Sequence, residues 1–487
     1  MRDHALSRRS VLLRAAGAGC AAALAGCLQP AKNAHPPMRV FDVRDFGAVG
    51  DGLTLDSPAI QRAIDSAGAA ATSGARAQVL LAGKKTYLAG TLRLHSHMDF
   101  HLEEGARLLV SANQQDYHPQ NPVAAEGQNA GEAALVAVDA EDIRLTGAGT
   151  IDGRSPDFMA RYDQPNEWWI PKPFRPRLVV FTNCTNIEVH DIHLIRAPLW
   201  TLHLIGCRHT LIDGITIRNQ LDVPNCDGID PDHCSDVEIR NCDIVCGDDA
   251  IVIKTTRQTR DFGLCRGITV KDCLIETQDA GVKIGTETTR DIQDVAFERC
   301  RIKSSCRGIG IQLRDAGNIS RILFRDIEFT SRYHSDPWWG RGEAISLTAI
   351  PRSPTTTVGT LSNIRFENIT GHAENSARIE GSAQSRIRDV TLDHVALTLQ
   401  RWTKYTGGLF DNRPTTAQTA LEVHSTPGFC VRHADQMALR QCRVSWAGNP
   451  PDYFSHALEA QDVTGLTHPD FAGTAAHADR DPAIVVS

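Results

Sequence analysis

The sequence predicts an all-β protein, a single-domain right-handed parallel β-helix (a solenoid) with an N-terminal capping helix. Short strands of alternating apolar residues recur along the chain, and glycine, asparagine and aspartate turn signals separate them. No helical periodicity intervenes between these strands. From residue 177 onward the pattern repeats at intervals of roughly 23 to 37 residues, which is the range of solenoid repeats.

The repeat is clearest in a Cys-x-x-apolar-x-apolar motif, which begins at Cys184, Cys234 and Cys265. Coils of a β-helix hydrogen-bond to one another at a spacing of about 4.8 Å, and insertions on one face vary the repeat length. The alternative all-β fold, a pair of β-sandwiches, requires evenly spaced hairpins with Asn-Gly turns. Such turns are scarce in this sequence, so the solenoid is favoured.

A helix is expected to cover the open N-terminal end of the stack. Ser57 and Pro58 form a typical helix start, with Ser57 as the N-cap and Pro58 at the first helical position. The apolar residues that follow lie on one helical face: Ala59, Ile60, Ala63, Ile64 and Ala67.

Composition limits the partners of this 487-residue chain. Its formal net charge is −7 with 22% charged residues and no long basic run, which disfavours a nucleic-acid or anionic-membrane partner. No apolar stretch in the body of the chain reaches the ~20 residues of a transmembrane helix. We expect a monomer that needs no cofactor and no metal.

The first 27 residues have the pattern of an export signal: a basic start, an apolar middle and a small-residue end. Arg8-Arg9 resembles a twin-arginine signal, and the segment ending at Cys27 resembles a bacterial lipobox. We therefore expect residues 1–27 to direct export to the periplasm or cell surface, with lipidation of Cys27. Residues 28–37 are expected to be a tether and residues 38–487 the β-helix domain; a plain cleaved signal is the alternative.

The cysteines follow the repeat. Those at 184, 207, 234 and 265 fall at one coil position, and those at 242, 273 and 300 at another. We expect mostly free, buried thiols; disulfides or a metal site are the alternatives, and the absence of a CxxC pair disfavours zinc. His95, His97 and His101 alternate with Asp99 on one strand face, which we interpret as solvated.

Four aspartates are expected to meet at one turn of the solenoid. Aligning the coils on Gly228-Ile229, Ala250-Ile251, Gly281-Val282 and Gly308-Ile309 places Asp227 above Asp249 at about one coil spacing, with Asp248 beside them and Asp279 one coil further. Like charges at this range raise at least one pKa. Turn capping is the common role of a single Asp-Asp pair, but two stacked pairs favour chemistry that needs a retained proton.

Glycoside hydrolysis needs such a set of carboxyl groups. An inverting enzyme uses one carboxylic acid to protonate the leaving oxygen and a carboxylate to activate water, at a separation of about 6.5–9.5 Å. We expect Asp248 to be the general acid and Asp227 and Asp249 to hold and deprotonate the water.

Several motifs resemble glycoside hydrolase family 28, the polygalacturonase and rhamnogalacturonan hydrolase family, over essentially the whole chain after residue 37. The matching segments are Val40-Phe41-Asp42-Val43, Phe46-Gly47-Ala48, Arg175 to Phe181, Pro198 to His203, Asn225 to Pro231 and Gly247 to Ile251. The resemblance implies a parallel β-helix, single-displacement inversion, the same three aspartates as catalytic residues, and no metal.

Two family motifs are altered in this chain. Asp279 stands in the family's Gly-His-Gly histidine position, and Gly310-Ile311-Gln312 replaces an Arg-x-Lys motif that binds the substrate carboxylate. Lys283 lies in the column of the missing arginine, one coil earlier, as a candidate displaced charge; a solvated lysine is the alternative. The residues expected to bind substrate are Asn225, Asp279, Lys283, Arg307, Gln312 and Arg314.

We therefore expect an exported hydrolase for a pectic linkage other than plain polygalacturonan, such as a rhamnogalacturonan, a substituted galacturonan or a terminal sugar, with a role in pectin degradation and cell wall organization. The pairs Trp168-Trp169 and Trp338-Trp339 are expected either to wall one end of the groove or to pack inside loops. The alternatives are a β-helical polysaccharide lyase, which uses calcium and an Arg or Lys base, and a non-catalytic carbohydrate-binding protein.

Overall fold

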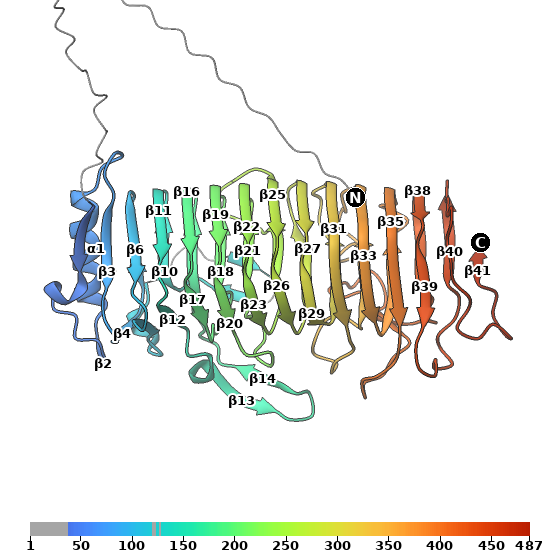
Figure 1. Ribbon diagram of the computed structural model, residues 1–487, viewed down its shortest axis with the longest axis horizontal. Helices are drawn as coiled ribbons and strands as arrows, with labels where there is room; N and C mark the ends of the chain where they lie inside the picture. Colours follow the sequence, from blue (N-terminus) through green and yellow to red (C-terminus); the bar gives the residue numbers. More distant parts are fainter. Residues whose placement is uncertain (1–37, 119–122, 126–127) are drawn as a thin grey trace, which may run out of the picture. The chain divides into compact units, whose positions relative to one another are not determined.

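The computed structural model describes residues 38–118, 123–125 and 128–487. The predicted signal, twin-arginine motif, Cys27 and tether lie outside the described residues. Over the described residues the chain forms a right-handed parallel β-helix in which successive coils follow one another from the N-terminal to the C-terminal end (Figure 1). No helix of these residues is long and apolar enough to cross a membrane.

Each coil contributes a strand to up to three parallel ladders. The first ladder, which carries the site, consists of β5 (Leu92–Arg93), β10 (Ala133–Val138), β15 (Arg177–Thr182), β18 (Leu202–Ile205), β21 (Ile229–Asp232), β24 (Ile251–Thr255), β27 (Ala280–Thr288), β30 (Arg307–Leu313), β32 (Glu343–Ala349), β34 (Asn375–Glu380), β38 (Phe429–Arg440), β40 (Leu458–Thr464) and β41 (Ile484–Val486).

The second ladder consists of β1 (Arg39–Asp42), β3 (Ala77–Leu81), β6 (Met98–Leu102), β11 (Glu141–Thr146), β16 (Thr185–His190), β19 (Arg208–Asp213), β22 (Ser235–Arg240), β25 (Cys265–Lys271) and β28 (Ile292–Glu298). The third consists of β2 (Asp51–Leu55), β4 (Thr86–Ala89), β7 (Arg107–Val110), β12 (Thr150–Asp152), β17 (His193–Ile195), β20 (Thr216–Arg218), β23 (Asp243–Cys246), β26 (Leu274–Thr277), β29 (Arg301–Ser305) and β39 (Arg443–Trp446). Three long strands belong to both the second and the third ladder: β31 (Ile319–Ser331), β33 (Leu361–Ala373) and β35 (Ile387–Leu399).

The Cys-x-x motif has a structural explanation. Its cysteines are buried in the core, and its third position has left-handed backbone geometry, with φ of +55° at Asn186, +57° at Asp236 and +65° at Gly267. Asparagine, aspartate and glycine tolerate this region best, so the motif places a bend next to a small buried side chain. The twelve cysteines of the described residues are all buried and free, as expected.

Aromatic rings also stack from coil to coil: the ring centroids of Phe297 and Phe324 lie 5.2 Å apart, and those of Phe324 and Phe366 lie 4.9 Å apart.

The predicted cap is helix α1 (Ser57–Ala70), which buries the five expected apolar residues against the first coil. The predicted N-cap was wrong by one residue, because Asp56 is the cap and Ser57 is the first helical residue. The Asp56 carboxylate accepts hydrogen bonds from the backbone of Val49 (2.7 Å) and Gly50 (3.1 Å). The Ser57 hydroxyl accepts one from Gly90 N–H (2.8 Å). Both side chains therefore fix neighbouring loops rather than the helix end.

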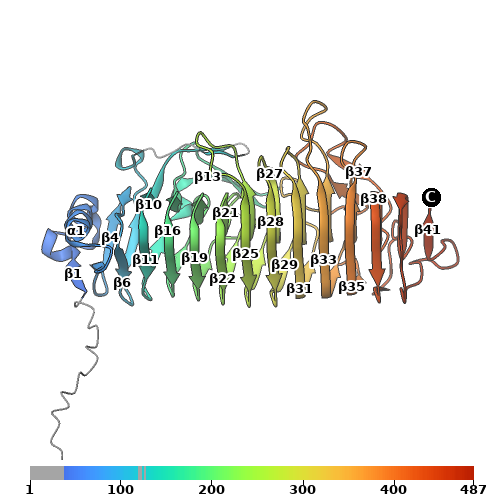
Figure 2. The ribbon, with the colours of Figure 1, turned by 90° about the horizontal axis from the view of Figure 1, so that it is seen from above.

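Insertions interrupt the solenoid as short antiparallel hairpins. They are β8 (Val123–Ala125) with β9 (Gln128–Ala130), β13 (Met159–Asp163) with β14 (Trp168–Pro171), and β36 (Leu409–Asp411) with β37 (Leu421–Val423). The insertions around β13 and β37 rise from the same side of the solenoid (Figure 2).

Candidate active site

Strand register brings the predicted aspartates together. Ile229 pairs with Ile251, Ile251 with Val282 and Val282 with Ile309, as the sequence alignment of the coils predicted. Asp227 and Asp249 each precede their strand by two residues, and Gly228 N–H donates to the Asp249 carbonyl (2.9 Å). One carboxylate oxygen from each of Asp227, Asp248 and Asp249 lies within 4.8 Å of the others.

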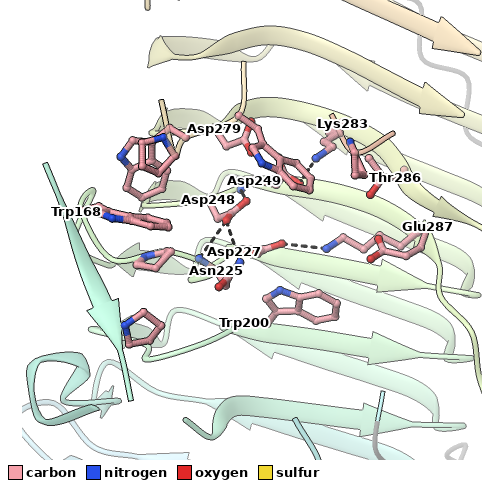
Figure 3. Close-up of a pocket in the computed structure, with 18 residues that line it drawn as sticks. Trp168, Trp200, Asn225, Asp227, Asp248, Asp249, Asp279, Lys283, Thr286 and Glu287 are labelled. Carbon is pink, nitrogen blue, oxygen red and sulfur yellow. Dashed lines mark hydrogen bonds and ion pairs between the residues drawn. The ribbon is translucent and has the colours of Figure 1, made fainter. Parts of the chain in front are cut away.

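The three carboxylates line a cavity of about 590 Å³ (Figure 3). Its lining is rich in acidic and aromatic residues: Trp168, Pro171, Trp200, Pro224, Asn225, Asp227, Asp248, Asp249, Lys254, Asp279, Lys283, Gly285, Thr286, Glu287, Pro337, Trp338, Trp339 and Pro414. Concave sites with aromatic walls and a few convergent polar groups are typical ligand sites.

Asn225 connects the two aspartate-bearing turns. It has left-handed backbone geometry (φ +61°), and its N–H donates to Asp248 Oδ2 (3.0 Å) while Arg175 donates to its Oδ1 (3.0 Å). Gly247 N–H donates to Cys226 Sγ (3.1 Å), which joins the same turns from the other side. Asn225 therefore lines the cavity and orients Asp248.

Buried lysines accompany two of the three aspartates. Lys254 Nζ lies 3.0 Å from Asp227 Oδ2 and 3.0 Å from Asp230 Oδ1, and 3.9 Å above the Trp200 ring. Lys283 Nζ lies 2.7 Å from Asp249 Oδ2. No ion pair of Asp248 is found among the described residues; its oxygens accept N–H groups of Asn225 and Asp249 (2.9 Å).

Burial raises the pKa of two of these aspartates, and their partners differ. Burial, reinforced by Asp227 and Asp249, raises the pKa of Asp248 to about 8. Burial also raises the pKa of Asp227 well above its usual value, but Lys254 opposes this effect. The pKa of Lys254 is itself raised by Asp227 and Asp230 against its burial. Among the three aspartates, Asp248 thus combines a raised pKa with no ion pair among the described residues, whereas Asp227 and Asp249 each have a lysine partner.

Asp279 lines the cavity one coil beyond Asp249, as the alignment predicted. Burial, with Asp249 nearby, raises its pKa well above the usual value, while Arg307 Nη1 lies 3.3 Å from Asp279 Oδ1. Lys283 pairs with Val252 and Gly310 in register and lines the cavity, as expected.

Arg307, Gln312 and Arg314 do not line the cavity. This corrects the prediction that their side chains contact the substrate there. All three are fully buried. Arg307 lies 3.8 Å from Glu343 and 3.4 Å from Asp411, Gln312 donates to the Arg413 carbonyl (3.1 Å), and Arg314 donates to Thr348 Oγ1 (2.9 Å). Their charges and amides stabilise the inserted loops that cover this face.

The β13–β14 hairpin and the loop between β31 and β32 form one wall of the cavity. Trp168, Trp338 and Trp339 line it, whereas Trp169 packs against the core. The Trp168 and Trp338 rings are edge to face with centroids 5.9 Å apart. Glu167, at the tip of the β13–β14 hairpin, bonds to Lys404 and Tyr405.

Sequence reasoning missed several cavity residues, chiefly Trp200, Lys254 and Glu287. Trp200 and Lys254 had a usable signal, since Trp200 lies within the segment Pro198 to His203 and Lys254 follows the segment Gly247 to Ile251 by three residues. Glu287 had none, because its place depends on the end of β27.

Three side chains with ligand atoms within 4.8 Å of one another are close enough to share a metal ion. The aspartate triad has this spacing, and so do His424, Cys430 and Glu459 elsewhere in the solenoid. In the triad, Lys254 and Lys283 already supply the positive charge that a divalent cation would bring. Each of these two lysines thus occupies a position beside a carboxylate that a divalent cation would otherwise take.

Gly228 sets the close approach of the two coils. A Cβ at this position lies 2.3 Å from the Ala250 carbonyl oxygen, so Gly228→Ala must push the Asp227 and Asp249 turns apart. We expect the variant to lose at least tenfold in activity and about 1–3 kcal/mol of unfolding free energy. Denaturant unfolding and catalytic rates measure both; Gly310→Ala, whose Cβ meets only ordinary contacts, is the control. Equal behaviour of the two variants contradicts the prediction.

Comparison with known proteins places the chain in a family. Residues 78–407 match the family model for glycosyl hydrolases family 28. The chain is 31% identical over 281 residues to a probable polygalacturonase of Vitis vinifera (55% of this chain, 56% of the relative) and 24% identical over 392 residues to an exopolygalacturonase of Zea mays (77% and 86%). The chain spans about half the length of the first two curated relatives that it matches.

Solved structures agree on the fold. The family 28 exopolygalacturonase of Yersinia enterocolitica aligns with a TM-score of 0.63 at 18% identity (88% of this chain, 78% of that one). The hyperthermoactive exopolygalacturonase of Thermotoga maritima aligns with a TM-score of 0.57 at 21% identity (74% and 88%). The family match covers more than half of the chain, and the chain therefore belongs to glycosyl hydrolases family 28.

Proposed function

We propose that this protein hydrolyses glycosidic bonds of pectin-type polysaccharides or oligosaccharides. The observation that carries the proposal is the meeting of three carboxyl groups in a cavity where two have a lysine and the third does not. The family, and relatives named as polygalacturonases, support a pectic substrate.

The mechanism follows from the charge distribution. Protonated Asp248 donates its proton to the glycosidic oxygen as the bond to the anomeric carbon breaks. Asp227 and Asp249 hold a water and remove its proton as its oxygen attacks that carbon. Their negative charges also stabilise the oxocarbenium-like transition state. Lys254 and Lys283 place a positive charge beside these two carboxyl groups inside a buried site.

Stereochemistry provides the sharpest test of this mechanism. Two ionised carboxylates opposite one acid suit the capture of a water and thus inversion. The rival is a covalent intermediate on Asp227 or Asp249, since one oxygen of each of the three carboxyl groups lies within 4.8 Å of the others. Proton NMR of the first-formed sugar distinguishes the two: the inverted anomer supports water activation, and the retained anomer contradicts it.

Product analysis with defined pectic oligosaccharides tests the function itself. We expect new reducing ends, no ultraviolet-absorbing unsaturated product and no loss of activity with a chelator. An unsaturated product and chelator sensitivity would instead identify a lyase, and binding without any product would identify a carbohydrate-binding protein.

The pH profile of kcat/KM is expected to be bell-shaped. Asp248 must be protonated, so activity falls about tenfold per pH unit above its pKa of about 8. Asp227 must be ionised, and because its pKa is raised, the acid limb lies above the pH at which an ordinary aspartate titrates. Initial rates from pH 4 to 10 measure both limbs; a flat profile between pH 7 and 10 contradicts the assignment of Asp248.

Export and lipid anchoring through Cys27 remain part of the proposal, supported by the sequence pattern of residues 1–27. Globomycin-sensitive processing and labelling with a radioactive fatty acid test it, with Cys27→Ser as the control.

A further inference from the structure

We propose that the sugar unit held in the cavity is uncharged, a neutral hexose or deoxyhexose, rather than a uronate. This inference rests on the proposed hydrolase function and names the substrate class of the same site. It is drawn from the charges that line the cavity, the partners of those charges and the nature of the walls.

The lining carries an excess of negative charge. Five acidic side chains and two lysines face the cavity: Asp227, Asp248, Asp249, Asp279, Glu287, Lys254 and Lys283. The acidic side chains thus outnumber the basic ones by five to two. A sugar carboxylate that enters a buried site of this kind loses its hydration and meets like charge, so it needs a cation of its own.

Neither lysine offers such a cation. Lys254 Nζ is shared between Asp227 and Asp230 at 3.0 Å each, and Lys283 Nζ lies 2.7 Å from Asp249. Drawing either ammonium toward a sugar carboxylate would leave a buried aspartate unpaired, which costs several kcal/mol. Both lysines therefore pair with carboxylates of the protein itself and are not available to a sugar carboxylate.

Two cations next to the cavity, Arg307 and Arg413, have acidic partners as well. Arg307 is buried against Asp279, Glu343 and Asp411, and Arg413 Nη2 lies 2.7 Å from Asp411 Oδ2. Arg413 also donates to the Asp336 carbonyl (2.7 Å), so its guanidinium joins two inserted loops instead of facing a ligand. At the position beside Lys283 in the next coil stands Gly310, which has no side chain.

The walls suit a neutral sugar. Trp168, Trp338, Trp339 and Trp200 supply aromatic faces, and Pro171, Pro224, Pro337 and Pro414 add apolar surface. Such faces pack against the C–H surface of a pyranose ring. Carboxylates accept strong hydrogen bonds from sugar hydroxyls, which a neutral hexose presents without electrostatic repulsion.

A matched pair of chromogenic substrates isolates the charge. The p-nitrophenyl α-D-galactopyranoside and α-D-galactopyranosiduronate differ only in a CH₂OH or a carboxylate at C6. We expect kcat/KM to be at least tenfold higher for the neutral sugar. If turnover is slow, calorimetry with the Asp248→Asn variant should show the same tenfold preference in affinity. An equal or higher value for the uronate overturns the inference while leaving the hydrolase function intact. Selective binding without hydrolysis of any pectic oligosaccharide overturns the function while leaving the inference intact.

A charge-restoring variant tests the cause. A Cβ at Gly310 meets Lys283 Cγ at 3.6 Å, an ordinary contact, so a longer side chain has room to start. Gly310→Arg should raise the uronate-to-neutral ratio of kcat/KM or affinity at least fivefold, whereas Gly310→Met, similar in length but uncharged, should not. If Gly310→Arg fails to fold, Glu287→Gln provides a second variant, because it also makes the charge of the cavity lining more positive. An unchanged ratio in the folded variants contradicts the electrostatic explanation.

Discussion

Replacing Asp248 by asparagine is expected to lower kcat for pectic oligosaccharides by at least 10³-fold, because an amide cannot donate the proton that the leaving oxygen needs. The cavity keeps its shape, so we expect KM or ligand affinity to change by less than about threefold. Steady-state kinetics and calorimetry separate these two effects. Asp243→Asn is the matched control, since Asp243 is half-exposed and pairs with Arg218 away from the cavity.

The same variant should be more stable than the wild type, with a defined pH dependence. The folded protein binds a proton at Asp248 up to pH about 8, whereas the unfolded chain releases it near 3.8, so Asp248 destabilises the fold increasingly as pH rises between these values. An amide removes this cost but satisfies only one of the two N–H groups that the carboxylate accepts. We expect a net gain of about 1–3 kcal/mol at pH 7 that shrinks toward pH 5. Loss of catalysis without any such gain would contradict the assignment of the proton.

The second large effect is expected for Lys254→Met, which should cost about 3–5 kcal/mol of unfolding free energy and abolish activity. The methionine fills most of the space but leaves Asp227 and Asp230 buried without their shared cation. Asp227 then binds a proton and no longer activates water. Denaturant unfolding measures the loss, which should shrink toward pH 5 because proton uptake by the two buried aspartates costs less free energy as the pH falls.

Two further variants make this prediction specific. Lys271→Met removes a lysine that lies 2.7 Å from Glu238 but is partly exposed, and should cost less than about 1 kcal/mol. Adding Asp230→Asn to Lys254→Met should recover part of the stability, because one unpaired charge is removed. Equal costs for Lys254→Met and Lys271→Met would show that the buried ion pair does not stabilise the site.

The register of the solenoid was predictable because each coil repeats the previous one. Once Ile229, Ile251, Val282 and Ile309 are aligned, neighbouring coils place Asp227 above Asp249 without information from distant segments. The buried thiols and the capping helix follow from equally local patterns. The N-cap was misplaced because Asp56 and Ser57 are both good caps, and contacts to Val49, Gly50 and Gly90 decide between them.

The contacts of the cationic and amide side chains near the cavity were not predictable in this way. Gln312 lies on β30 and Arg314 directly follows this strand, but loop residues about a hundred positions later, Asn412 and Arg413, cover both side chains. The partners of Lys254 likewise depend on side-chain rotamers within the cavity. Local repeats thus determine where the carboxylates lie, whereas insertions determine which cations remain available to a substrate.

The protonation of Asp248 at neutral pH is the central claim, and infrared difference spectroscopy tests it directly. The spectrum of the wild type minus that of Asp248→Asn should show the C=O band of a protonated carboxylic acid at pH 6–7, and this band should disappear with a midpoint near pH 8. A difference spectrum with only carboxylate bands at pH 6–7 would contradict the account.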